Sequence, residues 1–319
     1  MLVITRRDFF KKTGATAVAF GILKEQIAGL KALAAPLGLP IGSQTYPHRQ
    51  RVGEDFPALL RDMKALGIEA IELCSPSYGA NDFGKLADGQ ATRRILDDNG
   101  MKALSCHFGM NVLRNELQQQ IDWALDLGMI QMATATMSGR TVNGMTTEDE
   151  VKRAAAEYNK IAEGAKRNGM QQILHNEGFE NSRLEDGRLT YPVLLQYLDP
   201  NLVKMQFQMS SMPTVGNPIT YFTNHPGRFA SAHLQGVNAA AGMRAVSAPT
   251  LPVESTEPAG RGGRGGRGGR GGGGLSLGED SVDWPAVFEA AKIGGMQSFF
   301  VEQNWDLTVK SVEYLKTLS

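Results

Sequence analysis

The sequence has few cysteines, no long hydrophobic run and no excess of charge. Only Cys74 and Cys106 occur among 319 residues, which excludes the disulfide framework of a small secreted scaffold. A chain of this length buries an ample core without bridges, so we expect two free, mostly buried thiols. The roughly 18 consecutive apolar residues that a membrane-spanning helix needs are absent. Basic and acidic residues both number 33, so the formal net charge is zero.

Two adjacent arginines near the start of the chain indicate an export signal. Arg6 and Arg7 are followed by two phenylalanines, an apolar run from Gly14 to Leu23, and the small-x-small sequence Ala32-Leu33-Ala34. An ordinary amphipathic helix is the alternative. We predict a twin-arginine signal peptide at residues 1–34, which makes the twin-arginine export machinery a partner and the periplasm, or another exported location, the destination. The remaining chain is slightly acidic.

Strand-like and helix-like stretches then alternate to the end of the chain, with Gly67, Gly100 and Gly128 closing three of the helices. The predicted strands are residues 39–46, 68–73, 101–107, 129–135, the stretch from 173, 202–208, 229–234 and 296–302. The predicted helices are residues 55–66, 85–99, 113–127, 147–168, 191–198, 219–224, 282–292 and 309–318. Eight strand–helix pairs are what a closed barrel requires.

We therefore predict an α/β fold, a single-domain (β/α)₈ TIM barrel over residues 35–319. An open doubly wound sheet is the alternative, but it usually carries a glycine-rich phosphate-binding turn after its first strand. Here that strand is followed by Pro-His-Arg-Gln-Arg at residues 47–51. Without the signal and one insertion, the chain has the length typical of one barrel, about 250 residues.

The insertion runs from Ala239 to Leu277 and consists of alanine, proline and serine followed by Arg-Gly-Gly repeats. It has almost no large apolar residues to bury, so we expect it to be disordered. Arg-Gly-Gly repeats are also found in RNA-binding proteins. This tract has no interleaved aromatic residues, and the acidic barrel around it would repel a polyanion. We therefore expect no nucleic-acid partner.

Polar residues stand at the ends of most predicted strands, which in TIM barrels is where function lies. They are Gln44, His48, Glu72, His107, His175, Glu177, Gln208, His233 and Glu302. Side chains alternate faces along a strand, so Ile173, His175 and Glu177 share a face. The same count places Ala103, Ser105 and His107 together. A lone polar strand end is usually a solvated neighbour, but several converging on one rim indicate a site.

Five segments carry a resemblance when their order and spacing are taken together. They are His-Asn-Glu-Gly-Phe-Glu at 175–180, Leu-Asp-Pro-Asn-Leu-Val-Lys-Met-Gln-Phe-Gln at 198–208, Pro-Gly-Arg-Phe at 226–229 leading to His233, Val-Asp-Trp at 282–284 and Phe-Val-Glu at 300–302. From about Ile41 to Leu318, apart from the insertion, the chain resembles the xylose isomerase-like barrels known as sugar phosphate isomerases/epimerases.

This resemblance implies a divalent metal (Mn, Mg, Co or Zn) held by Glu177, Gln208, His233 and Glu302, with His175 as a competing ligand on the fifth strand. The family commonly has aspartate where this chain has Gln208, and a neutral amide weakens metal binding. No other cofactor is implied. Glu177 and Glu302 would act as the catalytic pair. Three further residues, Glu72, His107 and His175, would bind the substrate.

The implied reaction is proton transfer next to a ketose carbonyl through an enediolate, giving an isomerase or epimerase with a small carbohydrate as its substrate. The same enolate chemistry serves dehydratase-like relatives that eliminate a β-leaving group from a 3-keto-sugar or 3-keto-glycoside, so a lyase is the alternative. A sugar-binding barrel without catalysis is a third reading, raised by Gln208. Neither the substrate nor the oligomeric state follows from the sequence.

Overall fold

The computed structural model describes residues 35–78, 81–237 and 274–318. The predicted signal peptide, residues 1–34, and most of the predicted insertion lie outside these residues. The last four residues of the insertion are described. Among them, Leu277 is 2% exposed, and its backbone N–H donates a hydrogen bond to Ser311 Oγ at 3.0 Å. Packed chain therefore begins before Val282, where the next helix is predicted to start.

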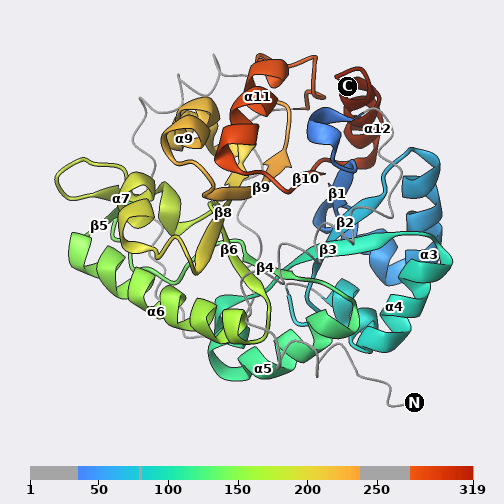
Figure 1. Ribbon diagram of the computed structural model, residues 1–319, viewed down its shortest axis with the longest axis horizontal. Helices are drawn as coiled ribbons and strands as arrows, with labels where there is room; N and C mark the ends of the chain where they lie inside the picture. Colours follow the sequence, from blue (N-terminus) through green and yellow to red (C-terminus); the bar gives the residue numbers. More distant parts are fainter. Residues whose placement is uncertain (1–34, 79–80, 238–273, 319) are drawn as a thin grey trace.

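Eight parallel strands close into a barrel, which confirms the predicted (β/α)₈ fold (Figure 1). The strands are β1 (Gly42–Gln44), β2 (Ala70–Cys74), β3 (Lys102–His107), β4 (Gln131–Thr134), β6 (Gln171–His175), β8 (Val203–Gln208), β9 (Phe229–Leu234) and β10 (Ser298–Val301). Each strand pairs with the next in this series, and β10 returns to β1. The C-terminal ends of all eight strands consequently meet at one rim.

Helices surround the barrel (Figure 1). They are α3 (Arg49–Ala65), α4 (Gly89–Asp98), α5 (Met110–Asp126), α6 (Glu148–Arg167), α7 (Thr190–Tyr197), α9 (Pro218–Asn224), α11 (Trp284–Gly294) and α12 (Trp305–Lys316). Local sequence sets their ends. Thr147 caps α6 by accepting a hydrogen bond from the Glu150 backbone N–H. Gly67, at φ 92°, follows α3 in the left-handed conformation that glycine tolerates. No helix in the described ranges has both the length and the hydropathy to cross a membrane.

The core has two layers. Outward-facing strand residues such as Leu73 and Phe207 belong to the large apolar cluster shared with the helices. Inward-facing Ala133, Ile173 and Ala230 form a small cluster inside the barrel. Both cysteines are free and buried, as predicted. The seam between β1 and β10 is tight, because a Cβ on Gly42 would lie 2.5 Å from the Phe299 carbonyl oxygen.

Two β-bulges change which side chains of the strands point into the barrel. Between β2 and β3 the pairing skips Leu104, and between β8 and β9 it skips Ala230. A bulge of this kind reverses the in–out alternation on one side of it. The prediction that Ala103 shares a face with Ser105 and His107 is therefore wrong. Ala103 belongs to the outer cluster, whereas Leu104 belongs to the small cluster with Ala70 and Phe300.

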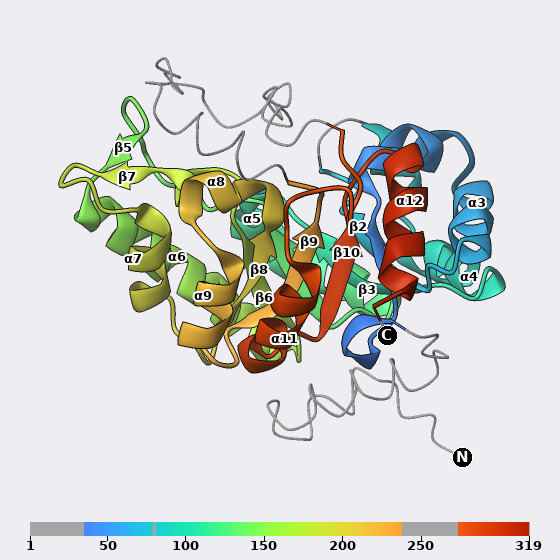
Figure 2. The same cartoon turned by 90° about the horizontal axis from the view of Figure 1, so that it is seen from above.

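The loops beyond the rim carry structure that the sequence pattern did not predict. Strands β5 (Met145–Thr146) and β7 (Arg183–Leu184) pair into a separate parallel sheet. A short helix, α8 (Met212–Val215), follows β8. All three lie at one end of the barrel, at the top of Figure 2. They follow β4, β6 and β8, so this is the end that carries the C-termini of the strands.

Candidate functional site at the C-terminal rim of the barrel

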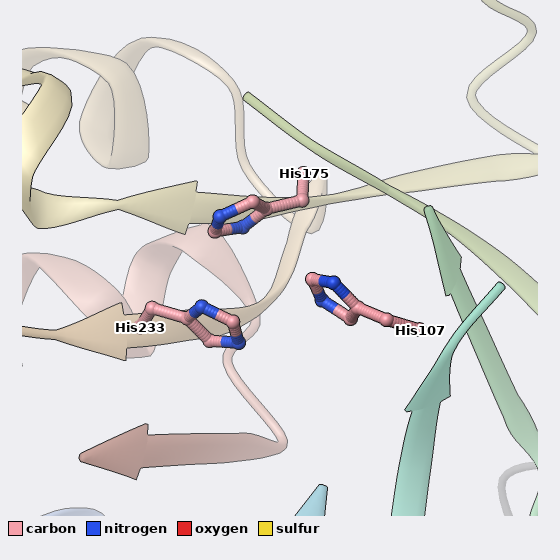
Figure 3. A group of neighbouring side chains, drawn as sticks. All are labelled: His107, His175 and His233. Carbon is pink, nitrogen blue, oxygen red and sulfur yellow. The ribbon is translucent and has the colours of Figure 1, made fainter. Parts of the chain in front are cut away.

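The predicted site residues converge at the C-terminal ends of the strands. Glu72 lies on β2, and three histidines end or nearly end their strands: His107 on β3, His175 on β6 and His233 on β9. Figure 3 shows the three imidazoles turned toward one another. Their ring centroids lie 4.3 to 5.2 Å apart, and none of the three residues is more than 4% exposed.

One amide joins the two predicted catalytic carboxylates. Gln208 Nε2 donates to Glu177 Oε1 at 3.0 Å and to Glu302 Oε2 at 2.7 Å. Gln235 Nε2 also donates to Glu302 Oε2, at 2.9 Å. The backbone N–H of Gln208 donates to Asn176 Oδ1 at 2.9 Å, which ties β8 to the segment after β6. Residues predicted from three separate segments thus meet at a single nitrogen atom.

Glu177 and Glu302 differ in how much of the side chain is exposed to solvent. The Glu177 side chain is 43% exposed, whereas that of Glu302 is 11% exposed. Burial raises the pKa of Glu177, but nearby His175 and the hydrogen bond from Gln208 outweigh it and hold the pKa below its usual range. Glu177 is therefore ionised at neutral pH, and it can accept a proton from a ligand that enters from solvent.

Below the rim, Glu72 is fully buried and saturated with hydrogen bonds. Gln44 Nε2 donates to Glu72 Oε2 at 2.9 Å, and Gln206 Nε2 donates to Glu72 Oε1 at 2.9 Å. His233 Nε2 forms a close ion pair with Glu72 Oε2. His107 Nε2 lies 3.3 Å from the same oxygen and 2.9 Å from Gln206 Oε1. Glu72 thus fixes the orientation of His233, and its predicted contact with substrate stays a prediction.

Glu72 and His233 each shift the pKa of the other toward its charged form. Burial raises the pKa of Glu72, but His107 and His233 lower it more, to well below its usual range. Burial lowers the pKa of His233, but Glu302 and Glu72 raise it more, to about 10. Without a bound cation, the pair at neutral pH is a carboxylate and an imidazolium, and His233 has to release its Nδ1 proton before Nδ1 can bind a metal. His175 differs from both, because burial and then the neighbouring His233 lower its pKa and keep it neutral.

The second ring nitrogen of His233 faces the rim. Nδ1 lies 3.2 Å from Glu302 Oε2 as an ion pair, and it has no hydrogen-bond partner among the residues that the structure describes. Both ring nitrogens of His175 and the Oε1 atom of Gln208 are also buried without a partner. Buried polar atoms normally have partners, so a group of orphans marks a place for a ligand.

These residues can hold a metal. The predicted ligands Glu177, Gln208, His233 and Glu302 are linked by consecutive contacts of 2.7 to 3.2 Å. In addition, one ligand atom each from His107, His175 and His233 lies within 4.8 Å of the others, so the three imidazoles could share an ion. A carboxylate on the far nitrogen of a ligating histidine, as Glu72 is on His233, is the usual support for such a ligand.

Sequence reasoning missed the amides that surround these groups. Gln206 lies two residues before Gln208 on β8, and Gln235 lies two residues after His233. Side chains two residues apart share a face of a strand, so Gln206 and Gln235 are expected on the same face as Gln208 and His233. That signal was in the sequence. No pattern shows that these amides donate to Glu72 and Glu302.

Solved structures of other proteins share the fold of this chain. Neither a family model nor a curated protein matches the sequence. Solved structures do match. A sugar phosphate isomerase/epimerase from Parabacteroides distasonis is 19% identical with a TM-score of 0.64, over 90% of this chain and 96% of that chain. The chain has the fold of the xylose isomerase-like TIM barrels.

Two other similar structures carry different descriptions. A probable 3-DHS dehydratase from Bacillus anthracis is 13% identical with a TM-score of 0.61, over 88% of this chain and 98% of that chain. A xylose isomerase-like TIM barrel protein from Mycobacterium smegmatis, in complex with magnesium, is 14% identical with a TM-score of 0.58, over 88% and 96%. At these identities the likeness establishes the fold, and the chemistry has to come from the residues.

Proposed function

We propose that this protein is a metal-assisted sugar isomerase or epimerase that moves a proton next to the carbonyl of a ketose. The observation that carries the proposal is the meeting of Glu177 and Glu302 at the Gln208 amide. The two carboxylates follow the ends of β6 and β10, which β8 and β9 separate around the barrel. They can therefore reach a bound sugar from two directions. The isomerase/epimerase description of a structure with the same fold agrees with this reaction class.

A divalent cation bound among these ligands would polarise the sugar carbonyl and stabilise the enediolate. The residues fit such an ion, because His233 Nδ1 and Gln208 Oε1 are buried and lack partners. Because Gln208 is neutral, we expect weaker binding than with an aspartate at this position.

The chain's own groups perform the proton steps. Glu177, ionised and exposed to solvent, removes the proton from the carbon next to the carbonyl. The electron pair of the broken C–H bond moves onto the carbonyl oxygen and gives the enediolate. Glu302, after taking up a proton from water, delivers it to the other face or to the neighbouring carbon, which yields an epimer or an isomer respectively. The roles exchange in the reverse direction.

A lyase is the second candidate, because the same first step also starts an elimination. If the carbon β to the carbonyl carries a leaving group, the electron pair of the enediolate expels it and no proton returns to carbon. The probable 3-DHS dehydratase with the same fold supports an elimination, and the substrate we propose for it here is a 3-keto-sugar or 3-keto-glycoside. Glu302 would then protonate the leaving oxygen.

Product analysis with matched variants tests the proposal. Purified protein with Mn²⁺ is incubated with a panel of ketoses and 3-keto-glucosides, and the products are separated into epimers, isomers and unsaturated sugars. We expect Glu177→Gln and Glu302→Gln each to lower kcat by about 10²-fold or more. The control Glu185→Gln, an exposed carboxylate outside the rim, should leave kcat unchanged. Full activity in Glu302→Gln contradicts the proposal. Sugar binding without turnover in the parent protein supports a non-catalytic barrel.

We also propose export through the twin-arginine route, on the basis of Arg6 and Arg7 and the residues that follow them. Fusing residues 1–34 to a reporter that is active only after export tests it. Replacing both arginines by lysine should abolish export, and unchanged export contradicts the assignment.

A further inference from the structure

The orphaned atoms at the rim form part of a ring of potential ligand atoms. Going round it, His175 Nε2 lies 3.7 Å from Glu177 Oε1, and Glu177 Oε1 lies 3.0 Å from Gln208 Nε2. Gln208 Nε2 lies 2.7 Å from Glu302 Oε2, and Glu302 Oε2 lies 3.2 Å from His233 Nδ1. Ligands about 2.1 Å from one ion stand roughly 3 to 3.5 Å apart. Two of the four distances fall in this range and the other two lie just outside it, so these atoms stand close enough to one another for several of them to share one ion.

Gln208 is the member of this ring least suited to bind a cation. Its amide nitrogen faces both carboxylates as a hydrogen-bond donor, so its hydrogen atoms occupy the space where a cation would sit. For Gln208 to become a ligand, the amide must turn to present Oε1 and give up both hydrogen bonds. A neutral carbonyl oxygen then replaces the charge that an aspartate would bring.

His175 can bind a cation without giving up a hydrogen bond. It is 0% exposed, neither ring nitrogen has a hydrogen-bond partner in the described part of the chain, and its ring centroid lies 4.3 Å from that of His233. Figure 3 shows its ring directed toward those of His233 and His107. His107 is less available, because its Nε2 is held by Gln206 Oε1 at 2.9 Å. An imidazole buried without partners is costly to keep unless something binds it.

We propose that His175, in place of Gln208, completes the metal site of this chain, so that the ligands are His175, Glu177, His233 and Glu302. This inference rests on the metal-assisted function proposed above. Two imidazoles with two carboxylates suit Zn²⁺, Co²⁺ or Mn²⁺, whereas Mg²⁺ prefers oxygen ligands alone. Gln208 then donates hydrogen bonds to Glu177 and Glu302 when no cation is bound, and it withdraws its N–H groups when one enters.

Binding of the metal alone tests the site. Full-length protein is stripped of metal, and the affinities for Zn²⁺, Mn²⁺ and Mg²⁺ are measured by titration calorimetry without any sugar. We expect Zn²⁺ and Mn²⁺ to bind more tightly than Mg²⁺. We expect His175→Ala to weaken Zn²⁺ binding by about tenfold or more, since it removes one of four ligands. Gln208→Ala should change it by less than about threefold.

His48 offers a matched control for the histidine variant. It is 4% exposed, and its Nε2 also lacks a partner, but its ring packs on Trp305 with the centroids 5.7 Å apart. His48→Ala should keep the parent affinity for Zn²⁺. If His175→Ala does not fold, His175→Gln provides a smaller change. The absorption bands of bound Co²⁺ then report whether a nitrogen ligand was lost.

The outcomes separate the two candidates for the fourth ligand. Parent-like affinity in His175→Ala together with a large loss in Gln208→Ala would overturn the inference in favour of the amide oxygen. Absence of binding by the parent protein also overturns it. Metal binding that depends on His175, in a protein that turns over no keto-sugar, supports the metal site while the proposed catalytic function fails.

Discussion

At the scale of single residues, the orientation of His233 depends on a buried carboxylate that touches no solvent. Glu72 is 0% exposed, and it holds the imidazolium of His233 from below while Gln44 and Gln206 hold Glu72. Such a pair adds little net stability, but removing one partner leaves an uncompensated buried charge. Its value here is geometric, because it points His233 Nδ1 at the rim.

We predict that Glu72→Gln lowers the unfolding free energy of the metal-free protein by about 3 kcal/mol, because the His233 imidazolium loses its close counter-ion. Denaturant unfolding measures the change. Glu313→Gln is the control, since the Glu313 side chain is 60% exposed and pairs with Lys316 at 2.6 Å on the surface. It should cost less than about 1 kcal/mol. Equal losses in the two variants would contradict the role given to Glu72.

At this scale the sequence predicts which residues meet but not how they bond. The strand-end pattern and the resemblance select Glu177, Gln208, His233 and Glu302, and the structure brings all four together. The direction of the Gln208 amide does not follow from either. It depends on two carboxylates from other strands that both need a donor.

At the scale of elements, the loops after β4 and β6 are joined through another buried carboxylate. Glu180, in the 3₁₀ turn η4 (Phe179–Asn181), accepts hydrogen bonds from the backbone N–H groups of Met137 and Gly178 and from Thr136 Oγ1. Gly178 fits tightly there, since a Cβ on it would lie 2.5 Å from Thr136 Oγ1. This junction fixes the segment that carries Glu177.

Glu180 gives stability a defined pH dependence. Burial raises its pKa from 4.5 to about 7, against hydrogen bonds that lower it. The folded state therefore binds a proton more tightly than the unfolded state does. The stability from this group is full below about pH 4.5 and is lost as pH rises through about 7, by about 3 kcal/mol. We predict that Glu180→Gln removes this loss.

Denaturant unfolding at pH 5 and pH 7.5 measures the effect as a difference between variant and parent, so that other titrating groups cancel. The control Glu185→Gln, on the exposed part of the same loop, should keep the parent dependence. A difference between Glu180→Gln and parent that does not change with pH would contradict the shifted pKa.

The elements themselves were largely predictable, and the exceptions have physical reasons. Glycines in the left-handed region mark the ends of α3, α4 and α5, which helped to locate β2, β3 and β4. The sheet of β5 and β7 has two residues per strand, too few for any alternation to appear. The bulge at Leu104 depends on pairing with β2, so no period-two count along β3 alone could place Ala103 correctly.

At the scale of the whole molecule, the chain segments that flank the insertion are held close together by the barrel. Gly236, just before the insertion, lies against Leu275, near the end of the insertion, since a Cβ on Gly236 would lie 2.2 Å from the Leu275 carbonyl oxygen. Beyond that point Leu277 is buried, and its backbone is bonded to Ser311. Loop closure between adjacent ends depends only weakly on the length of the loop.

We predict that replacing residues 239–273 with a short glycine–serine linker changes the unfolding free energy by less than about 1 kcal/mol. Extending the deletion through Leu277 should cost about 2 kcal/mol or more, because a buried leucine and its hydrogen bond are lost. Parallel thermal and denaturant unfolding of the two deletions checks both values. Equal stability of the two would contradict the assigned boundary.

The count of strand–helix pairs in the sequence is enough to predict the closed barrel. The reaction can be inferred only from the residues at the C-terminal rim. The central claim is that this rim removes a proton next to a sugar carbonyl. Nuclear magnetic resonance in D₂O, with metal-loaded protein and the panel of ketoses and 3-keto-glucosides, tests it most directly. We predict that one C–H next to the carbonyl exchanges for deuterium, whether the sugar is then epimerised or loses its leaving group. Conversion of any of these sugars with that proton fully retained would contradict the account.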